Sequence, residues 1–286
     1  MRLGTRGSAL ALAQANSVAA ALGGAEIVTI TTSGDRDRAR GDKERWVREI
    51  DAALLRGDVE LCVHSAKDVP AELAEGIVIA AVPPRADPRD ALCGASALTA
   101  LRPGARVGTS SLRRAAQLRA LRDDLEVAEV RGNVDTRLGK LAAGDYDAIV
   151  LALAGLHRLG RAAEATATLD AMVPAAGQGA LAVTVRADDD GSRAAVARIS
   201  DRGAVASLAA ERALVRALEA DCHTPMGAHA TTDADGAGGL TLRAFVGRTD
   251  GSMWLRDELT GDEPEALGAE VARRLRAAGA DEVLGR

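Results

Sequence analysis

Aromatic side chains are almost absent from this chain. Its 286 residues include two Trp, one Tyr and one Phe. Proteins that hold single-stranded nucleic acid stack the bases on aromatic rings, so binding of this kind is not expected. An excess of basic residues is missing too, because the formal net charge at pH 7 is -5. A general binder of phosphate backbones needs a basic face, which only a local arginine cluster could supply, and its binding would fall steeply with salt.

Cysteines and long apolar runs are also scarce. Cys62, Cys93 and Cys222 lie far apart, and no two of them form a Cys-x-x-Cys pair. An odd number at such spacings argues against a disulfide framework and against a zinc site, so no metal is expected. The first apolar stretch, residues 9–22, is interrupted by polar residues. Neither a membrane span nor a secretory leader is predicted, and the expected location is the cytoplasm.

What the chain does contain is an alternation of short apolar runs with Ala/Leu/Arg stretches of helix length. Apolar residues make up 47% and charged residues 27%, as in soluble globular proteins. Strands are expected at "EIVTITT", "VELCVH", "GIVIAAV", "ARVGTS", "LEVAEV", "DAIVLAL" and "ALAVTV". Helices are expected at residues 9–22, 46–55, 112–121 and 134–141. This alternation predicts an α/β fold with βαβ units and parallel sheets.

Two segments continue neither a helix nor a strand. "VPPRADPRD", residues 82–90, has three prolines, and "VPAAGQGA", residues 173–180, combines Pro with two Gly. If the chain leaves one domain at the first segment and returns at the second, the middle part is an inserted domain and a cleft lies between the two. The predicted domains are 1–84 with 180–199, then 88–174, and finally a small α+β domain at 204–286.

Ionisable residues are concentrated in "HSAKDVP", directly after the apolar run "VELCV". Ligand sites in open parallel sheets lie at the carboxyl ends of the strands. We therefore expect His64, Ser65, Lys67 and Asp68 to face the cleft. The alternative is structural: Asp68 caps a turn before Pro70 and Lys67 is solvated.

The run "VGTSSLRRAAQL" repeats this arrangement. Thr109, Ser110 and Ser111 follow a strand, and the next helix begins with Arg113 and Arg114. Hydroxyls and free N–H groups at a helix N-terminus bind anions, and arginine forks match carboxylates and phosphates. The alternative is a helix cap followed by two solvated arginines.

The same pattern recurs at further strand ends, which argues against the structural alternative. The residues concerned are Arg6 and Ser8 in "LGTRGSALALAQ", Arg131, Asn133 and Arg137 in "VRGNVDTRLGKL", and Arg158 in "LAGLHRLG". Several arginines at one sheet edge predict a ligand with many negative groups, each taking a charge-assisted hydrogen bond.

Cys222 lies in the turn "LEADCHTPMGA" among polar neighbours. A lone cysteine is usually a small core residue. A reactive thiol needs partial exposure, however, and this position offers more of it than Cys62 inside a strand pattern. Cys222 is therefore the candidate nucleophile.

Eight motifs together carry a family resemblance. "LGTRGSALALAQ", "VHSAKDVP", "DPRDAL", "VGTSSLRRAAQL", "RGNVDTRLGKL", "YDAIVLALAGLHRLG", "AAGQGALAV" and "ERALVRALEADCHTPMGA" resemble, in order, those of the porphobilinogen deaminases (hydroxymethylbilane synthases). The resemblance implies two domains like those of periplasmic binding proteins and a third domain that carries a cofactor. It also implies a monomeric transferase of tetrapyrrole and haem biosynthesis, with porphobilinogen as substrate and neither membrane nor nucleic acid as partner.

The reaction implied by the resemblance joins four porphobilinogen molecules head to tail with loss of ammonia, giving hydroxymethylbilane. The primer is a dipyrromethane cofactor that the family holds through a thioether, and Cys222 matches the attachment position. Asp68 matches the carboxylate that steadies the electron-poor azafulvene left when ammonia departs, with Lys67 beside it. The residues expected to bind the carboxylates of cofactor and substrate are Arg6, Ser8, Ser65, Lys67, Thr109, Ser110, Ser111, Arg113, Arg114, Arg131, Asn133, Arg137, Arg158 and Gln178. Arg89, Lys43 and Trp46 fall near further family positions.

This chain departs from the family pattern in two places. The segment "RDRARGDKERWVRE" is shorter than the usual lid segment, and Asp221 stands before Cys222 where Gly is common. A carboxylate beside the thiol disfavours the thiolate. A non-catalytic anion-binding receptor is the alternative from the fold alone, but it leaves Cys222 and the third domain without a role.

Overall fold

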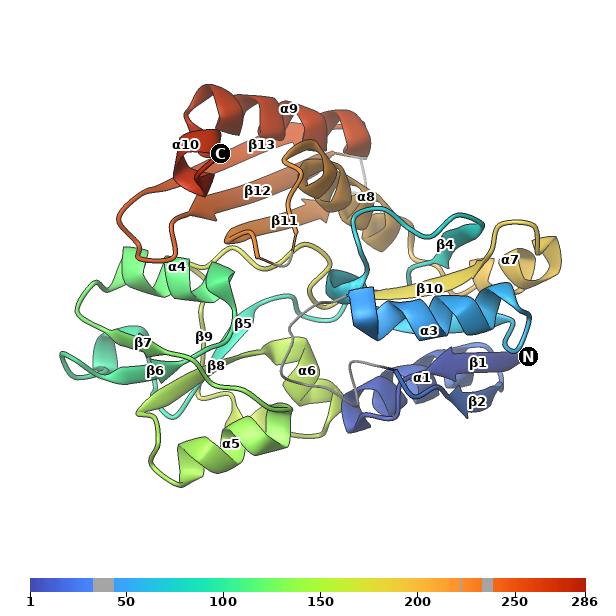
Figure 1. Cartoon of the computed structure of the whole chain (residues 1–286), viewed down its shortest axis with the longest axis horizontal. Coiled ribbons are helices and arrows are strands. Elements are labelled where there is room, and N and C mark those ends of the chain that lie inside the picture. Colours follow the sequence, from blue (N-terminus) through green and yellow to red (C-terminus); the bar gives the residue numbers. More distant parts are fainter. Residues whose placement is uncertain (33–43, 222, 233–238) are drawn as a thin grey trace.

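The computed structural model describes residues 1–32, 44–221, 223–232 and 239–286, which form three sheets with their own helices (Figure 1). Two of the sheets have five strands and the third has three. The predicted α/β class, with two sheet-and-helix units and a small C-terminal unit, is confirmed. Among the described residues, no helix is both long and apolar enough to cross a membrane.

The first sheet has the strand order β2-β1-β3-β10-β4. Strand β1 pairs in parallel with β2 and β3, whereas β10 runs antiparallel to β3 and β4. A core that includes Leu3, Val18 and Val183 is buried between this sheet and α1. The strands are β1 (Arg2–Thr5), β2 (Glu26–Thr29), β3 (Leu61–Ser65), β4 (Ile77–Ala81) and β10 (Leu181–Arg186), and the helices are α1 (Ala9–Ala21), α3 (Glu44–Leu55) and α7 (Asp190–Ala197).

The second sheet has the equivalent order, β7-β6-β8-β5-β9. Strand β6 is parallel to β7 and β8, and β5 is antiparallel to β8 and β9. Its strands are β5 (Asp90–Cys93), β6 (Arg106–Gly108), β7 (Glu126–Ala128), β8 (Ala148–Ala152) and β9 (Ala167–Thr168), and its helices are α4 (Leu112–Leu121), α5 (Val134–Ala142) and α6 (Leu153–Arg158).

The chain crosses between these two sheets twice. Strand β4 ends at Ala81 and β5 begins at Asp90, while β9 ends at Thr168 and β10 begins at Leu181. The predicted parallel pairs are present, but each sheet also contains a strand that runs antiparallel, for a physical reason. The first strand after each crossing enters its sheet from the edge where the parallel strands end, so it must run against them. The domain boundaries themselves stay a prediction.

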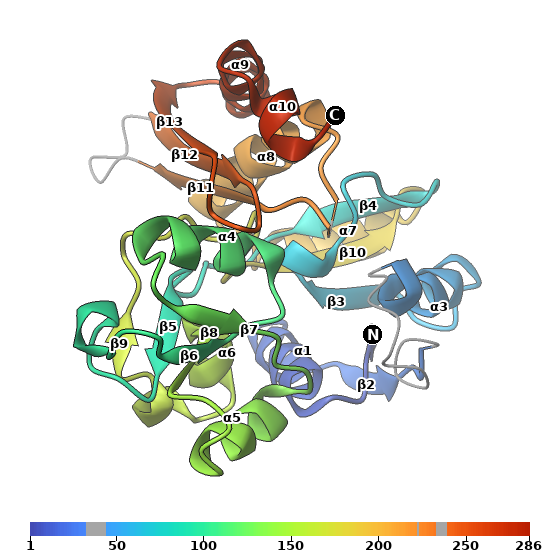
Figure 2. The same ribbon diagram turned by 60° about the vertical axis from the view of Figure 1, so that its left-hand side comes forward.

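The third sheet is antiparallel, in the order β11-β12-β13, and helices pack on one of its faces (Figure 2). On the other face, the chain's one Phe, Phe245, is fully buried against Ala116 of α4 and Val173. The small unit therefore rests on the second unit through an apolar contact. Its elements are α8 (Arg202–Ala217), β11 (Met226–Thr232), β12 (Leu240–Gly247), β13 (Trp254–Gly261), α9 (Pro264–Ala277) and α10 (Ala280–Leu284).

Candidate active site

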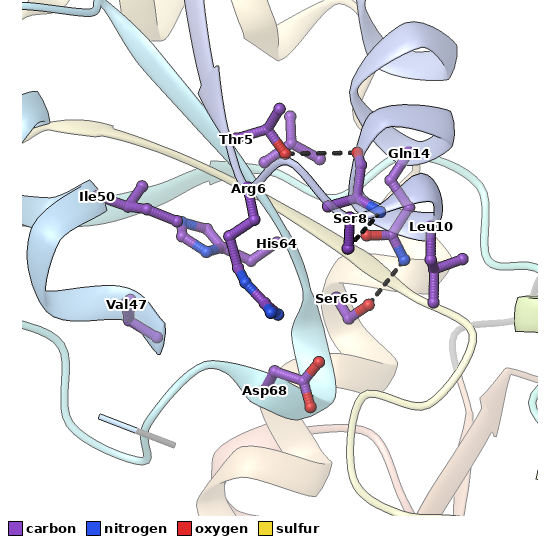
Figure 3. Close-up of a pocket in the computed structure, with 12 residues that line it drawn as sticks. Thr5, Arg6, Ser8, Leu10, Gln14, Val47, Ile50, His64, Ser65 and Asp68 are labelled. Atoms are coloured by element: carbon purple, nitrogen blue, oxygen red, sulfur yellow. Dashed lines mark hydrogen bonds between the residues drawn. The ribbon is translucent and has the colours of Figure 1, made fainter. Parts of the chain in front are cut away.

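A pocket opens at the carboxyl ends of β1 and β3 (Figure 3). Its volume is about 460 Å³, with open solvent at the mouth included. It brings together four of the predicted site residues, namely Arg6, Ser8, Ser65 and Asp68, and His64 lies in its wall. The lining also includes the apolar side chains of Leu10, Val47, Ile50 and Val63. The strand-end reasoning therefore located a real concavity.

The hydroxyl groups of the pocket are fixed by local hydrogen bonds. Ser8 is the N-cap of α1, and its Oγ accepts a hydrogen bond from Ala11 N at 3.3 Å. Ser65 Oγ accepts a hydrogen bond from Gln14 Nε2 at 2.7 Å, and Gln14 is itself buried in α1. A hydroxyl that accepts one bond still has its own proton to donate. Both serines therefore suit a ligand rich in acceptors.

Arg6 and Asp68 extend from opposite walls toward the same space (Figure 3). Arg6 directly follows β1, and Asp68 ends the 3₁₀ turn Ala66–Asp68 that follows β3. A carboxylate aimed into a cavity can accept hydrogen bonds from ligand N–H groups and stabilise positive charge formed there. Among the described residues that line this pocket, Asp68 is the one that is acidic.

His64 stays neutral at physiological pH. Burial lowers the pKa of its imidazole to about 4, and Arg6 acts in the same direction, against the opposite effect of Asp68. Its Nε2 lies 3.3 Å from Thr184 Oγ1. His64 is therefore no source of positive charge in the pocket.

The pKa of the Lys67 amine lies close to neutral pH. Burial lowers the pKa of Lys67 to about 8, although the carboxylate of Asp68 opposes the shift. Its Nζ donates a hydrogen bond to Gln178 Oε1 at 3.4 Å. Lys67 is therefore not the freely solvated side chain of the structural alternative.

Gln178 is held between two glycines of the return segment. Gly177 has φ +72, and a Cβ there would lie 2.8 Å from the backbone carbon of Ala66. Gly179 has φ +86, and a Cβ there would collide with the carbonyl oxygen of Ala86. Both positions require glycine, because of the left-handed backbone and the close approach of a second chain segment. The "GQG" motif thus holds Gln178 between the 3₁₀ turn that begins at Ala66 and the first crossing segment at Ala86.

The amide of Gln178 is fully used within the protein. It is 1% exposed, and its Nε2 donates to Pro88 O at 2.6 Å and to Asp90 Oδ1 at 2.9 Å. Its Oε1 accepts the bond from Lys67. Gln178 does not line the pocket, and its amide joins Lys67 to Pro88 and Asp90.

Arg113 and Arg114 are buried, which neither sequence interpretation anticipated. Arg113 Nη1 lies 2.7 Å from Asp90 Oδ2, and Arg114 Nε lies 2.9 Å from Asp90 Oδ1. Each also donates to a main-chain carbonyl, Val173 O for Arg113 and Val150 O for Arg114. Two guanidinium groups share one carboxylate, so one net positive charge remains.

Local hydrogen bonds orient four predicted site residues of the second unit: Thr109, Ser110, Ser111 and Asn133. Ser111 caps α4 and Asn133 caps α5, as the structural alternative required for Ser111. Thr109 Oγ1 accepts a hydrogen bond from Ser111 N at 3.1 Å. Ser110 Oγ accepts one from Arg137 Nη2 at 3.0 Å. Arg137 and Ser110 are thus brought together, and their role toward a ligand stays a prediction.

The remaining predicted arginines lie outside the pocket lining. Arg158 Nη2 donates to Gly179 O at 2.7 Å, next to Gln178. Arg131 pairs with Glu129 at 2.7 Å on the exposed surface. Arg89 pairs with Asp87 at 2.6 Å and with Asp170 at 3.0 Å. Of the three, Arg158 is the one that contacts the segment around Gln178.

Some predictions fall on residues that the structure does not describe. Cys222 and Lys43 lie outside the described residues, and for Trp46 only its place in α3 is given. Asp221, next to Cys222, accepts hydrogen bonds from His223 N at 2.9 Å and Thr224 Oγ1 at 2.8 Å. Burial acts to raise the pKa of this carboxyl, but these bonds prevail and lower it. Asp221 therefore carries a negative charge in this turn.

Sequence reasoning missed two residues that organise the site, Gln14 and Asp90. Gln14 is the last residue of the "LGTRGSALALAQ" motif, in which Arg6 and Ser8 are the predicted site residues. Asp90 lies in "DPRDAL", in which Arg89 is the predicted site residue. The available signal was a charged residue at the start of the apolar run "ALC", since a buried charge implies a partner of opposite sign.

Two models of one protein family match most of this chain. The family model "Porphobilinogen deaminase, dipyromethane cofactor binding domain" matches residues 1–194, and "Porphobilinogen deaminase, C-terminal domain" matches residues 205–277. The chain belongs to the porphobilinogen deaminase family. The porphobilinogen deaminase of Rubrobacter xylanophilus is 48% identical, over 99% of this chain and 96% of that protein. Porphobilinogen deaminase 1 of Streptomyces coelicolor is 45% identical, over 100% of this chain and 97% of that protein.

Solved structures give a weaker likeness. Protein PG110 from Staphylococcus aureus has a TM-score of 0.44 and 14% identity, with 74% of this chain and 91% of that one covered. A periplasmic substrate-binding protein from Coxiella burnetii has a TM-score of 0.43 and 18% identity, with 72% and 94% covered.

The residues present fit the cofactor of porphobilinogen deaminases. Dipyrromethane made from porphobilinogen carries acetate and propionate groups, so its binding site needs buried cationic donors. Arg113 Nε is buried and, within the described part of the chain, has no hydrogen-bond partner. Together with the net positive charge that Asp90 leaves uncompensated, this donor suits a carboxylate of the cofactor.

Proposed function

We propose that this chain is a hydroxymethylbilane synthase that condenses four porphobilinogen molecules head to tail, with release of ammonia. The supporting observation is the pocket at the ends of β1 and β3, where Asp68 faces Arg6 in a chain of the porphobilinogen deaminase family. When bound, the dipyrromethane cofactor supplies the terminal pyrrole to which the first substrate ring is joined. Cys222 holds it through a thioether.

Asp68 is the catalytic carboxylate. Loss of ammonia from porphobilinogen leaves positive charge spread over the pyrrole ring and its nitrogen. A carboxylate within hydrogen-bond reach of that N–H stabilises the charge and accepts the proton released when the new bond forms. The neutral His64 in the same wall adds no competing cation.

The cations and hydroxyls around Asp68 hold the acidic side chains of the substrate. Arg6, Ser8 and Ser65 offer donors from two walls of the pocket, and Lys67 lies beside Asp68. Charge-assisted hydrogen bonds to carboxylates are stronger than neutral ones and fix orientation. The substrate is thereby positioned with its pyrrole nitrogen toward Asp68.

The cluster of Arg113 and Arg114 holds a carboxylate of the cofactor, with Arg137 and Ser110 nearby for a longer chain. Burial lowers the pKa of Arg137, and the positive charge of Arg114 acts in the same direction. An incoming carboxylate relieves this repulsion, which favours binding of a polyanion. Gln178 connects this cluster to Lys67 through its bonds to Asp90 and Lys67, and Arg158 donates to the carbonyl of the next residue, Gly179.

We further propose that the protein is a monomer, that it is located in the cytoplasm and that it acts without nucleic acid. The acidic total charge and the scarcity of aromatic rings support the last point. The proposal also includes the three domains with boundaries at 84/88, 174/180 and 199/204. Gel filtration with light scattering tests the monomer, which should elute at a mass close to 29.4 kDa.

Intact mass spectrometry tests the proposed function. Purified protein should exceed the sequence mass by two linked pyrrole units, and Cys222→Ser should remove the excess. Cys93→Ala is the matched control, because Cys93 is buried in β5 and should leave the adduct in place. Protein that carries no adduct and consumes no porphobilinogen would refute the proposal.

A further inference from the structure

Asp90 has an unusual set of partners for a single carboxylate. It is 1% exposed at the start of β5 and accepts from Arg113, Arg114 and Gln178. Both oxygens are engaged: Oδ2 by Arg113 Nη1 at 2.7 Å, and Oδ1 by Arg114 Nε and Gln178 Nε2, each at 2.9 Å. Both oxygens of this carboxylate therefore accept from protein groups on three different side chains, which restrains its position.

The charges show that Asp90 remains ionised. Burial acts to raise the pKa of its carboxyl, but Arg113 and Arg114 outweigh burial and hold the pKa far below the ordinary value. Breaking a buried ion pair on one side leaves an uncompensated charge, so each guanidinium is held firmly where Asp90 places it. The unpartnered Arg113 Nε therefore has a fixed direction.

Gln178 extends this arrangement to the first unit. Its Nε2 binds Asp90 and its Oε1 accepts from Lys67 Nζ at 3.4 Å. Lys67 adjoins Asp68 in the 3₁₀ turn after β3. Thus one amide connects the arginine cluster of the second sheet to the turn that carries the catalytic carboxylate of the first.

We propose that Asp90 is a positioning residue, which fixes Arg113 and Arg114 for the cofactor and, through Gln178, sets them against Lys67 and Asp68. This inference rests on the proposed function. Asp90 touches neither substrate nor reacting atoms; it acts through the residues that do. Fixing donors before the ligand arrives lowers the cost of binding and of charge stabilisation.

The test compares Asp90→Asn with Asp147→Asn as a matched control. Asp147 lies in the same unit and also pairs with an arginine, Arg102, but its side chain is 32% exposed. It precedes the first residue of β8, whereas Asp90 lies opposite the last residue of that strand, Ala152. We expect Asp90→Asn to lower the fraction of molecules with the cofactor adduct, measured by intact mass. In the loaded fraction, KM for porphobilinogen should rise about 10-fold, the size expected for residues in one hydrogen-bond network. Asp147→Asn should load and turn over normally.

A pH profile distinguishes positioning from a loss of folded protein. The charged groups that act on Lys67 are Asp68, Arg114, Asp90 and Arg113. Removing the negative charge of Asp90 lowers the pKa of Lys67 further, so the alkaline limb of kcat/KM should move to lower pH. A purely structural role would leave that limb in place.

Gln178→Met covers the case in which Asp90→Asn does not fold. It removes the amide without removing a charge, and it should raise KM and move the alkaline limb of the loaded enzyme. If both variants fold and both match the unsubstituted enzyme in adduct fraction, KM within about 2-fold and pH profile, the inference is overturned. If only Gln178→Met folds, the inference is overturned when this variant alone matches the unsubstituted enzyme in those three measurements. If the unsubstituted protein itself carries no adduct, the proposed function has failed instead.

Discussion

The guanidinium of Arg85 forms a buried bidentate ion pair with the carboxylate of Glu211, at 2.6 and 3.2 Å. Glu211 lies in α8 with 0% exposure, and it also accepts from Gly177 N at 2.6 Å and from Ala230 N at 2.8 Å. Arg85 belongs to the first crossing segment, Gly177 to the second, and Ala230 to β11. One carboxylate therefore fastens both crossings to the third unit.

Glu211→Gln should destabilise the protein by about 3 kcal/mol, because it leaves the guanidinium of Arg85 buried without its counter-charge. Urea unfolding followed by circular dichroism measures the change. The double variant Glu211→Gln with Arg85→Met removes both charges and should recover part of the loss. Glu270→Gln is the control, since Glu270 and Arg273 form an exposed pair on α9, where little change is expected. Equal urea midpoints for Glu211→Gln and the unsubstituted protein would contradict this account.

Local signals made much of the fold predictable. Helix α4 was predicted with its observed bounds, 112–121, because Ser111 is a good cap and the following residues form helices readily. The residues after β1 and β3 were predicted to share a site because parallel strands end at a common edge, and Arg6 and Asp68 do line one pocket. Each of these inferences needs only a short stretch of sequence.

What the sequence did not reveal depends on distant contacts. Asp90 pairs with Arg113 across 23 positions and with Gln178 across 88, so no local pattern links them. Strand β9 has two residues, too few for any alternation to be seen. The reversed direction of β5 and β10 follows from where the chain re-enters each sheet, which composition does not encode. The short helix α6 follows β8 without any intervening turn signal.

Asp68→Asn should keep the cofactor adduct yet lower kcat by at least about 100-fold, the range of a lost acid-base and charge-stabilising group. Single-turnover assays with porphobilinogen measure the rate, and intact mass confirms the adduct. The control is Asp58→Asn, which removes an exposed carboxylate of the same unit that pairs with Arg56. Near-normal turnover of Asp68→Asn would exclude its catalytic role.

Thiol reactivity should separate the three cysteines. Burial raises the pKa of the Cys62 thiol strongly and that of Cys93 to about 11, so neither should react with iodoacetamide at pH 8. Cofactor-free protein should therefore be alkylated once, at Cys222, and loaded protein not at all. Asp221→Asn removes a negative charge beside that thiol and should speed alkylation. Peptide mapping gives the site, and labelling of Cys62 or Cys93 in folded protein would count against this assignment.

The pH dependence of substrate capture should follow Lys67. Because burial lowers the pKa of Lys67 to about 8, its positive charge is lost as the pH rises through that value. Since porphobilinogen is a dicarboxylate, kcat/KM should fall over the same range. Lys67→Arg keeps a positive charge at every pH in the range and should abolish this alkaline limb, while Lys67→Met should give a low value throughout. An unchanged limb in Lys67→Arg would assign it to another group.

Stability should depend on Asp51 in α3. Burial raises the pKa of its carboxyl from 3.8 to about 6. Between these values the folded state holds a proton that the unfolded chain has lost, so stability falls as the pH rises from about 4 to about 6. Asp51→Asn removes this loss, and above pH 7 it should raise the free energy of unfolding by about 1–2 kcal/mol, with allowance for the exposed part of the side chain. The gain should vanish near pH 4, where the carboxyl of the folded state is already protonated. Urea titrations at pH 4, 6 and 8 measure it, and a gain of equal size at all three would show that packing, and not the charge of Asp51, is responsible.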